Sequence, residues 1–423
     1  MENKIKTTPL HDWHLTHGAN MAEFGGYHMP LWYSSAKNEH MAPLTGAGIF
    51  DTSHMAVVLV KGPDAHDILQ LCFTNDMDRC IGKSKKPIFP GRCVYGAYLN
   101  EAGGVIDDTI IYKLEEDDYM AVVNAGMGGR VAEHLEAHKG DRKVAITDLT
   151  DQVGKIDVQG PLAAKILAAV VKDPENVFEK LPYFAFKGRF ESGSSPADPV
   201  HLLDGTPLLL SRTGYTGEFG FEIFIGPENT VRLWDMILEA GQPLGVVPCG
   251  LAARDSLRCG AVLPLSHQDI GDWPFINHPW PFALAFTDDR NNFTKKFIGA
   301  RALLEIETSE YTYAFVGKDL RKVSTGDPAV VCDTDGNEVG RVLSCATDMG
   351  IGRHKDRIYS IASPGKPEGF KPKGLCCGFV KVNTPMASGQ TVEIRDNRRK
   401  LKVTIVDDIR PDRTARLPLK EML

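Results

Sequence analysis

One acidic residue stands on an otherwise apolar strand face. Residues 105–112 alternate as a β-strand does, so Asp108 shares one face with Ile106, Ile110 and Tyr112. A carboxylate in apolar surroundings is costly unless something binds it, and its pKa can be tuned for proton transfer. The pattern favours Asp108 as a candidate acid or base. The alternative is that Asp108 caps a turn or pairs with a basic side chain.

A second carboxylate follows a glycine-rich turn. Glycines at 214, 217 and 220 fall within seven positions and predict a tight connection between two strands. Glu222 then points away from Phe221 and Ile223. A carboxylate fixed at this point suits a planar edge with two donors, such as a guanidine or a 2-amino-4-oxo heterocycle. An ordinary hairpin with an exposed glutamate is the alternative.

A helix that begins near Gly250 carries two arginines one turn apart. Good helix formers follow this glycine, and Arg254 and Arg258 share one face of the predicted helix. Two guanidinium groups on one face could hold a carboxylate. The alternative is a surface ion pair with Asp255.

Two further patterns are weaker. A Gly-Met-Gly-Gly run at 126–129 lies between a predicted strand and a predicted helix, as a dinucleotide loop does, but Val131 takes the place of the third glycine. Residues 11–17 hold a histidine at every third position, and His134 lies one helical turn before His138. No cysteine or carboxylate completes either set at ligand spacing, so the sequence predicts no metal site.

Composition narrows the function classes. The chain has 423 residues and a net charge of −7, which argues against general binding to nucleic acid or anionic membranes. No apolar run approaches the roughly 20 residues of a membrane span, and Met1–Lys6 lacks the apolar core of a signal peptide. Nine scattered cysteines support neither a disulfide framework nor a zinc ribbon. We therefore expect a cytoplasmic protein.

The elements that position these residues recur in two sets, each in the order strand, helix, strand, strand, helix. The first set is predicted at 57–60, 65–71, 105–113, 119–124 and 130–138, and the second at 155–158, 162–171, 207–211, 221–225 and 230–240. From about Tyr311 onward, strands and Gly/Asp turns predict a small antiparallel barrel or sandwich. The fold class is therefore α+β, with Asp108 and Glu222 on strands of two related lobes.

Several segments, taken together and in order, resemble the glycine-cleavage T-protein family of folate-dependent aminomethyltransferases. They are Phe24–Pro30, Phe50–Met55, Gly103–Asp108, Gln159–Pro161, Arg212–Glu222, Gly250–Arg258 and Phe297–Gly299. The resemblance covers nearly the whole chain. It implies a three-domain cloverleaf around a central folate channel, with α+β lobes at 1–150 and 151–305 and a C-terminal β-barrel at 306–423.

The resemblance also assigns roles. Asp108 matches the catalytic aspartate of the family. The positions that match or approach its tetrahydrofolate site are Tyr95, Tyr112, Tyr215, Glu222, Arg254 and Arg413. The implied reaction passes the carbon of an aminomethyl group from a lipoylated carrier protein of the H-protein type to tetrahydrofolate, and ammonia leaves. It implies no metal, nucleic-acid or membrane partner, and a monomer or homodimer.

The departures from the family pattern fall at the substrate end. Pro281 replaces an expected acidic residue, Trp273, Trp280 and Phe282 stand nearby, and the third domain has an insertion between about Cys345 and Cys376. Aromatic faces stabilise methylated cations. A folate-dependent demethylase of a methoxy-aromatic, sulfonium or methylamine donor is therefore an alternative. Non-enzymatic relatives that assist iron–sulfur proteins carry a Lys-Gly-Cys-Tyr signature that this sequence lacks.

Overall fold

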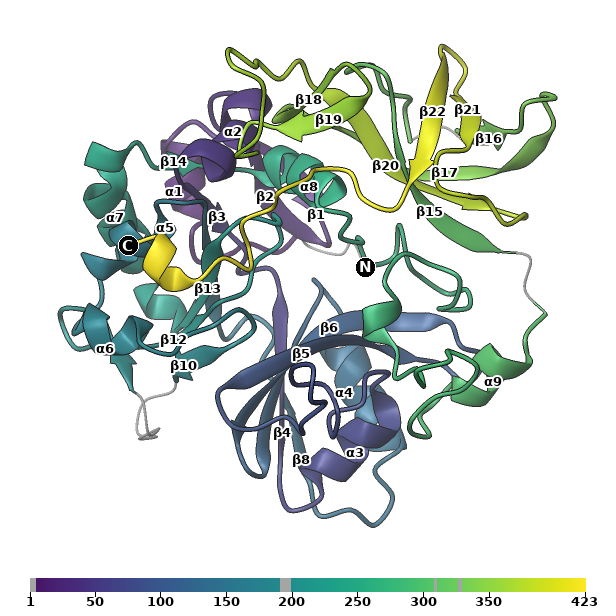
Figure 1. The fold of residues 1–423 in the computed structure, drawn as a ribbon. Helices are drawn as coiled ribbons and strands as arrows, with labels where there is room; N and C mark the ends of the chain where they lie inside the picture. Colours follow the sequence, from purple (N-terminus) through teal and green to yellow (C-terminus); the bar gives the residue numbers. More distant parts are fainter. Residues whose placement is uncertain (1–4, 191–198, 308–309, 326–328) are drawn as a thin grey trace.

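Three bodies meet around the middle of the molecule: two lobes of sheet and helix, and a β-barrel (Figure 1). The computed structural model describes residues 5–190, 199–307, 310–325 and 329–423, so most of the opening segment Met1–Lys6 lies outside it. The predicted α+β fold with a C-terminal antiparallel barrel is confirmed. Within the described residues, every helix is too short or too polar to cross a membrane.

The first lobe is a five-stranded antiparallel sheet in the order β5-β6-β7-β4-β8. Its strands are β4 (Ala56–Lys61), β5 (Arg92–Leu99), β6 (Val105–Glu115), β7 (Asp118–Val123) and β8 (Ala145–Asp148). Helices α3 (Ala65–Cys72) and α4 (Gly128–Ala137) cover one face, where their apolar stripes pack on alternate strand residues. The predicted strands and helices of this set are confirmed, whereas β5 and β8 were missed.

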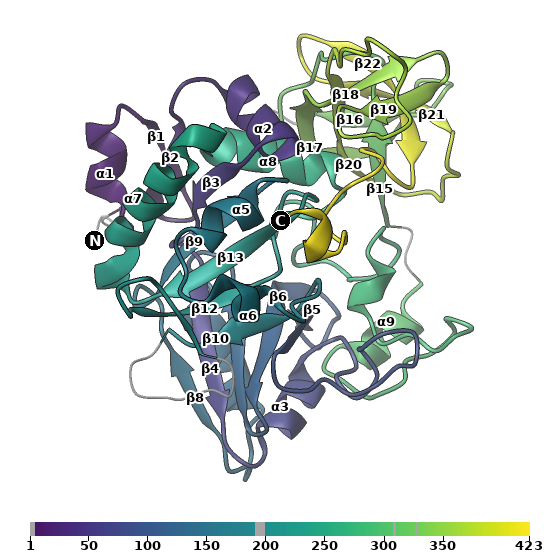
Figure 2. The same cartoon turned by 60° about the vertical axis from the view of Figure 1, so that its left-hand side comes forward.

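The second lobe is a seven-stranded sheet in the order β10-β12-β13-β9-β3-β14, with β11 on β12. Its strands are β3 (Gly48–Asp51), β9 (Gly154–Gln159), β10 (Phe186–Gly188), β11 (Val200–His201), β12 (Pro207–Ser211), β13 (Gly220–Ile225) and β14 (Val247–Pro248). Helices α5 (Ala163–Ala168), α6 (Pro174–Phe178) and α7 (Thr230–Gly241) supply much of its outer core, and Figure 2 shows α7 beside β9.

The chain crosses between the two sheets twice, once between β3 and β4 and once between β8 and β9. β3 pairs antiparallel with β9, so residues 48–51 of the predicted first lobe belong to the second sheet. The N-terminal elements precede it: α1 (His11–Thr16), β1 (Asn20–Phe24), β2 (Tyr27–Trp32) and α2 (Ala36–Thr45). The predicted boundary at residue 150 falls where the chain passes from β8 of the first sheet to β9 of the second, but β3 lies on the other side of it. Pairing between strands a hundred residues apart leaves no local pattern that would reveal it.

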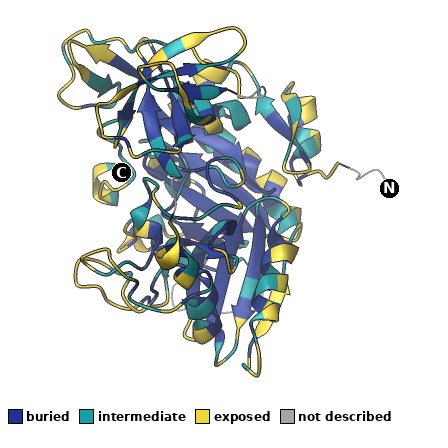
Figure 3. Ribbon diagram, turned by 90° about the vertical axis from the view of Figure 1, so that its right-hand side faces the viewer, coloured by how far each residue is buried: buried dark blue, intermediate teal, exposed yellow. Residues whose placement is uncertain are grey.

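The inner faces of the two sheets pack on each other. Tyr112 of β6 lies with its ring centroid 5.7 Å from that of Phe224 in β13 and 5.2 Å from that of Phe186 in β10. Each sheet is therefore buried on both faces, and Figure 3 shows buried strands in the middle with exposed helix surfaces outside. A polar side chain on an inner face must consequently find its partners within the protein.

The third body is a closed antiparallel barrel. Its strands are β15 (Tyr311–Val316), β16 (Val330–Cys332), β17 (Glu338–Asp348), β20 (Leu375–Val382), β21 (Thr391–Arg395) and β22 (Lys400–Val406). The region predicted as an insertion contains a hairpin of β18 (Ile351–His354) and β19 (Arg357–Ser360). Helix α8 (Leu251–Gly260) packs between the barrel strand β17 and the N-terminal strand β2, while α9 (Ala300–Glu305) precedes the barrel.

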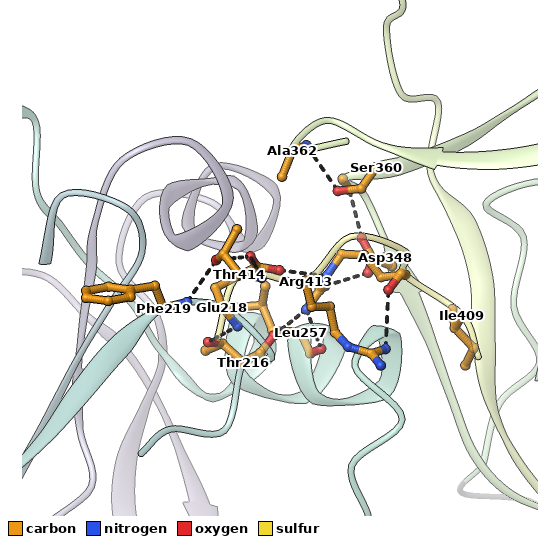
Figure 4. A network of polar contacts seen from close by, with 12 residues as sticks. Thr216, Glu218, Phe219, Leu257, Asp348, Ser360, Ala362, Ile409, Arg413 and Thr414 are labelled. Atoms are coloured by element: carbon orange, nitrogen blue, oxygen red, sulfur yellow. Dashed lines mark hydrogen bonds and ion pairs between the residues drawn. The ribbon is translucent and has the colours of Figure 1, made fainter. Parts of the chain in front are cut away.

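A buried arginine joins the barrel to the second lobe. Arg410 has no exposed surface, and its guanidinium lies 2.6 Å from Asp348 of β17 and 3.0 Å from Glu218 of the glycine-rich turn. His40 of α2 binds the other oxygen of Asp348 at 2.8 Å. Figure 4 shows Asp348 and Glu218 on either side of the C-terminal segment. Polar groups from the barrel, the second lobe and the N-terminal elements therefore meet at one point.

Replacing Arg410 with methionine should leave two carboxylates buried without their cation, and it should lower the free energy of unfolding by about 3–5 kcal/mol. Burial alone would raise the pKa of Asp348, but Arg410 and His40 outweigh burial and hold it at about 2. The stabilisation is therefore complete above pH 4 and is lost as the pH falls toward 2. Urea unfolding measures the effect, with the exposed Arg398→Met as the control. Equal losses in both variants would contradict the assignment.

Candidate active site

Asp108 lies on β6 within reach of two hydrogen-bond donors. The Tyr95 hydroxyl of β5 donates to Asp108 Oδ2 at 2.8 Å, and Asn124 Nδ2 donates to Oδ1 at 2.8 Å. Tyr95 pairs with Ile110, so it shares the strand face that alternation predicted for Asp108. Burial, and then the charge of Asp107, raise the pKa of Asp108 to about 6. The group can therefore both give and take a proton near neutral pH.

Asp107, which sequence reasoning passed over, completes a pair of adjacent carboxylates. It is fully buried and accepts hydrogen bonds from the Asn124 backbone at 2.8 Å, from Asn124 Nδ2 at 2.9 Å and from Ser266 Oγ at 2.7 Å. His267 Nε2 lies 3.6 Å from Asp107 Oδ1, and a hydrogen bond with Asp107 raises the pKa of this histidine. His267 has a φ of +62°, a left-handed conformation that is costly for a non-glycine residue.

Glu222 belongs to a buried group of alternating charges. Lys155 Nζ of β9 lies 2.5 Å from Glu222 Oε1 and 2.7 Å from Asp157 Oδ1, and Arg254 of α8 lies 2.9 Å from Asp157 Oδ2. Glu222 and Asp157 are direct cross-strand partners. Burial would raise the pKa of Asp157, but Lys155 and Arg254 lower it. The exposed glutamate considered as an alternative is therefore wrong, because only 7% of Glu222 is accessible.

The predicted arginine pair separates into two environments. The Arg254 guanidinium lies over Tyr215, with its carbon 4.7 Å from the ring centroid, and the Tyr215 hydroxyl donates to the Pro264 carbonyl. Arg258 is buried and bound to Asp269, Asp255 and Ser344. Arg258 therefore joins α8 to the barrel, and only Arg254 stands with the candidate site residues.

A buried histidine beside Arg254 has an unsatisfied ring nitrogen. His54 is 2% exposed, and its buried Nδ1 has no hydrogen-bond partner among the described residues. Burial, and then the charge of Arg254, lower the pKa of His54 to about 4. It is therefore neutral at pH 7 and retains capacity for one more hydrogen bond. The segment Phe50–Met55 matched the family, but nothing in its pattern singled out this nitrogen.

Tyr112 and Arg413, which the resemblance assigns to the folate site, form no hydrogen bond or ion pair with Asp108, Glu222 or Arg254 in the described part of the chain. Tyr112 is fully buried between the sheets, and its hydroxyl lies 3.3 Å from Thr213 Oγ1. Arg413 forms an ion pair with Asp408 and lies against Gly217, where a Cβ atom would come within 2.7 Å of its Cδ. Arg413 therefore lies beside the turn that carries Tyr215, whereas Tyr112 belongs to the packed interface.

The aromatic residues predicted at the substrate end do not form one wall. Phe282, which is 59% exposed, lies with its ring centroid 5.9 Å from that of Tyr95. Trp280 is buried and donates Nε1 to the Val262 carbonyl, and Trp273 lies under Lys381 of the barrel. Of the three, only Phe282 contacts the group around Asp108.

Asp108→Asn should stabilise the protein in a pH-dependent way. The folded state holds the pKa of Asp108 at about 6, above its ordinary value near 4, so the ionised carboxylate costs stability above pH 6 and costs nothing below pH 4. We expect the variant to gain roughly 2–3 kcal/mol at pH 8 and nothing at pH 4, measured by urea unfolding at both values. Asp117→Asn, on the exposed β6–β7 turn, is the control. A variant that is less stable at pH 8 would refute the pKa assignment.

Comparison with known proteins shows the family to which this fold and sequence belong. The family model described as the GCVT N-terminal domain matches residues 10–273. An aminomethyltransferase of Geobacillus sp. (strain WCH70) is 34% identical over 94% of this chain and 97% of its own length, and one of Shouchella clausii (strain KSM-K16) is 37% identical over 86% and 91%. The glycine cleavage system aminomethyltransferase T from Bartonella henselae superposes with a TM-score of 0.73 at 26% identity, over 95% of this chain and 97% of that one. The chain therefore belongs to the glycine-cleavage T-protein family.

Proposed function

We propose that this protein transfers a one-carbon unit from an aminomethyl group, carried on the lipoyl arm of a partner protein, to tetrahydrofolate, with release of ammonia. Full-length relatives at 34–37% identity are aminomethyltransferases, which supports the reaction class. The observation that carries the proposal is the placement of the Asp107–Asp108 pair beside Tyr95, with Tyr215 and Arg254 near by. After burial, the charges of Asp108 and Tyr215 both raise the pKa of Tyr95, as expected of close neighbours.

The residues present fit a pterin ring. Lys155 donates to Glu222 Oε1, whereas no described residue donates to Oε2. Oε2 can therefore accept a hydrogen bond from the 2-amino-4-oxo edge of the pterin. Arg254 donates one N–H to Asp157, and its other N–H groups remain available to a ligand. His54 Nδ1 can form one more hydrogen bond. Tetrahydrofolate supplies the amine nitrogens that accept the carbon. The chain supplies the acceptors and donors that orient it.

In this proposal Asp108 donates and accepts the proton that the reaction transfers. Loss of ammonia needs a proton on the leaving nitrogen, and attack by an amine releases one. With a pKa near 6, Asp108 can do both, while Tyr95 and Asn124 hold its two oxygens in place. Asp107 keeps the pKa of Asp108 high by its charge, and Ser266 and Asn124 keep Asp107 itself satisfied.

Asp108→Asn should lower turnover by about a hundredfold or more, the usual scale for acid–base groups. Because tetrahydrofolate is oriented by other residues, its affinity should change little. Steady-state kinetics from pH 5 to 9 would also lose the ionisation near pH 6 in this variant. Asp117→Asn should leave both turnover and the pH profile unchanged. An Asp108→Asn enzyme that keeps most of its activity would remove Asp108 from the mechanism.

Glu222→Gln should weaken tetrahydrofolate binding about tenfold or more, since a hydrogen bond to a charged group contributes about 1.5–3 kcal/mol. Calorimetry with tetrahydrofolate measures the change, and Glu239→Gln on the exposed face of α7 is the matched control. Thermal melting checks that Lys155, left with Asp157 alone, still supports the fold. Wild-type affinity in a folded Glu222→Gln protein would show that Glu222 does not bind the pterin.

The donor is tested by mass detection of the folate products. An aminomethyl-loaded lipoyl carrier should give methylenetetrahydrofolate and ammonia in equal amounts, and omission of the carrier should abolish both. Small methylated donors, namely methoxy-aromatics, sulfonium compounds and methylamines, should give no product. Carrier-independent formation of 5-methyltetrahydrofolate without ammonia would overturn the proposal and establish the demethylase alternative.

A further inference from the structure

A cluster of one cysteine and two histidines lies on the helical side of the first lobe, on different elements from the residues described above. Cys72 is the last residue of α3, His134 lies in the last turn of α4, and His138 follows α4 directly. One ligand atom of each lies within 4.8 Å of the others. The sequence predicted no metal site because the nearest cysteine in space is far away along the chain. The packing of α3 beside α4 supplies it.

Two polar groups of this cluster and its surroundings lack partners. His134 Nε2 is buried without a hydrogen bond among the described residues, and so is the hydroxyl of Tyr98, a residue with no exposed surface. The Tyr98 and His134 rings lie 6.1 Å apart. Both groups therefore retain capacity for a further partner at this point.

The second histidine is held in an orientation suited to a ligand. His138 Nδ1 lies 2.8 Å from the His134 carbonyl oxygen, which can only accept, so Nδ1 carries the proton. The lone pair of a neutral His138 is therefore on Nε2. A backbone carbonyl that binds one ring nitrogen while the other binds metal is a common arrangement at metal centres.

Two cations hold the carbonyl groups at the ends of α3 and α4 beside the cluster. Arg142 donates to the carbonyls of His138 and Lys139, and Lys295 donates to those of Gln70 and Phe73. The helix ends that carry the three side chains are therefore fixed. A cysteine sulfur and imidazole nitrogens are ligands that zinc prefers.

We propose that Cys72, His134 and His138 form a zinc site that joins α3 to α4. Ligand atoms around tetrahedral zinc lie about 3.3–3.6 Å apart. Side-chain rotations that move each ligand atom by about 1 Å would bring the three atoms to these separations. On binding, the Cys72 sulfur exchanges its proton for the metal, and the proton goes to solvent. Water takes the fourth position, or Glu101 does, whose Oε1 lies 3.7 Å from His138 Nε2.

The position of Glu101 gives the site a structural consequence. Glu101 lies in the turn between β5 and β6, and these strands carry Tyr95 and Asp108. Zinc at the cluster would link the two covering helices beside the turn from which both strands extend. We therefore expect the metal to stabilise the first lobe without entering the reaction.

The test uses the full-length protein, treated with a chelator and then titrated with zinc alone by calorimetry and with Co²⁺ by absorption. We expect one equivalent of zinc, a rise in melting temperature, and a thiolate-to-cobalt charge-transfer band. Cys72→Ser should abolish that band, and Cys72→Ser and His138→Ala should each weaken zinc binding at least tenfold. Cys80→Ser and the exposed His354→Ala are controls that should bind as the wild type does.

The proposal is overturned if the wild-type protein binds no zinc, or if Cys72→Ser and His138→Ala both bind it with unchanged affinity. Loss of folding in either variant is detected by the melting curve without metal. In that case Cys72→Ala and His138→Gln repeat the comparison. Tetrahydrofolate binding by the chelator-treated protein is measured in parallel, so failure of the zinc site is distinguished from failure of the proposed reaction.

Discussion

Two carboxylates on the inner face of the second sheet, Asp157 and Glu222, are neutralised by Lys155 and Arg254 where the two sheets pack on each other. An isolated charge at this depth would cost several kcal/mol, so Lys155, Asp157, Glu222 and Arg254 must remain together. Two of them are cations and two are anions, so the group is neutral as a whole. The carboxylate of Glu222 and the guanidinium of Arg254 are therefore oriented before any ligand arrives. Ordering them costs nothing on binding, which is the advantage of a preorganised site.

The carboxylates of β6 follow the opposite rule. Asp107 and Asp108 are adjacent, and the groups that bind them are mainly neutral donors: Tyr95, Asn124 and Ser266. Burial and then the charge of Asp107 raise the pKa of Asp108 and outweigh these hydrogen bonds, which lower it, so the pKa rises to about 6. The neutral group around Lys155 is suited to binding a ligand, because its charges stay fixed. The Asp107–Asp108 pair is suited to proton transfer, because Asp108 can gain or lose a proton at a small cost in free energy.

The sequence predicted what depends on local periodicity and missed what depends on contact across the chain. Alternation placed Asp108 on the correct face of β6, and the glycine turn placed Glu222 correctly on β13. Lys155 and Asp157 were missed because they matter only through their contacts with Glu222 between β9 and β13. The spacing of residues along the sequence does not reveal such a pairing. Asp107 was assigned to the opposite face. Asn124 nevertheless joins it to Asp108, because a single amide can reach both carboxylates.

The barrel takes part in the site through helix α8. Arg410 follows the last barrel strand, and it donates to the Leu257 carbonyl while its backbone N–H donates to the Gly260 carbonyl 2.9 Å away. The first turn of the same helix carries Arg254, which Asp157 holds from the second sheet. The helix is thus fixed at one end by the barrel and at the other by the second lobe. Glu218 and Asp348 both need Arg410, so the barrel cannot move away without exposing or orphaning buried charge. The position of Arg254 over Tyr215 therefore depends on both bodies being folded and docked, which explains why a folate site on the lobes would need the third domain.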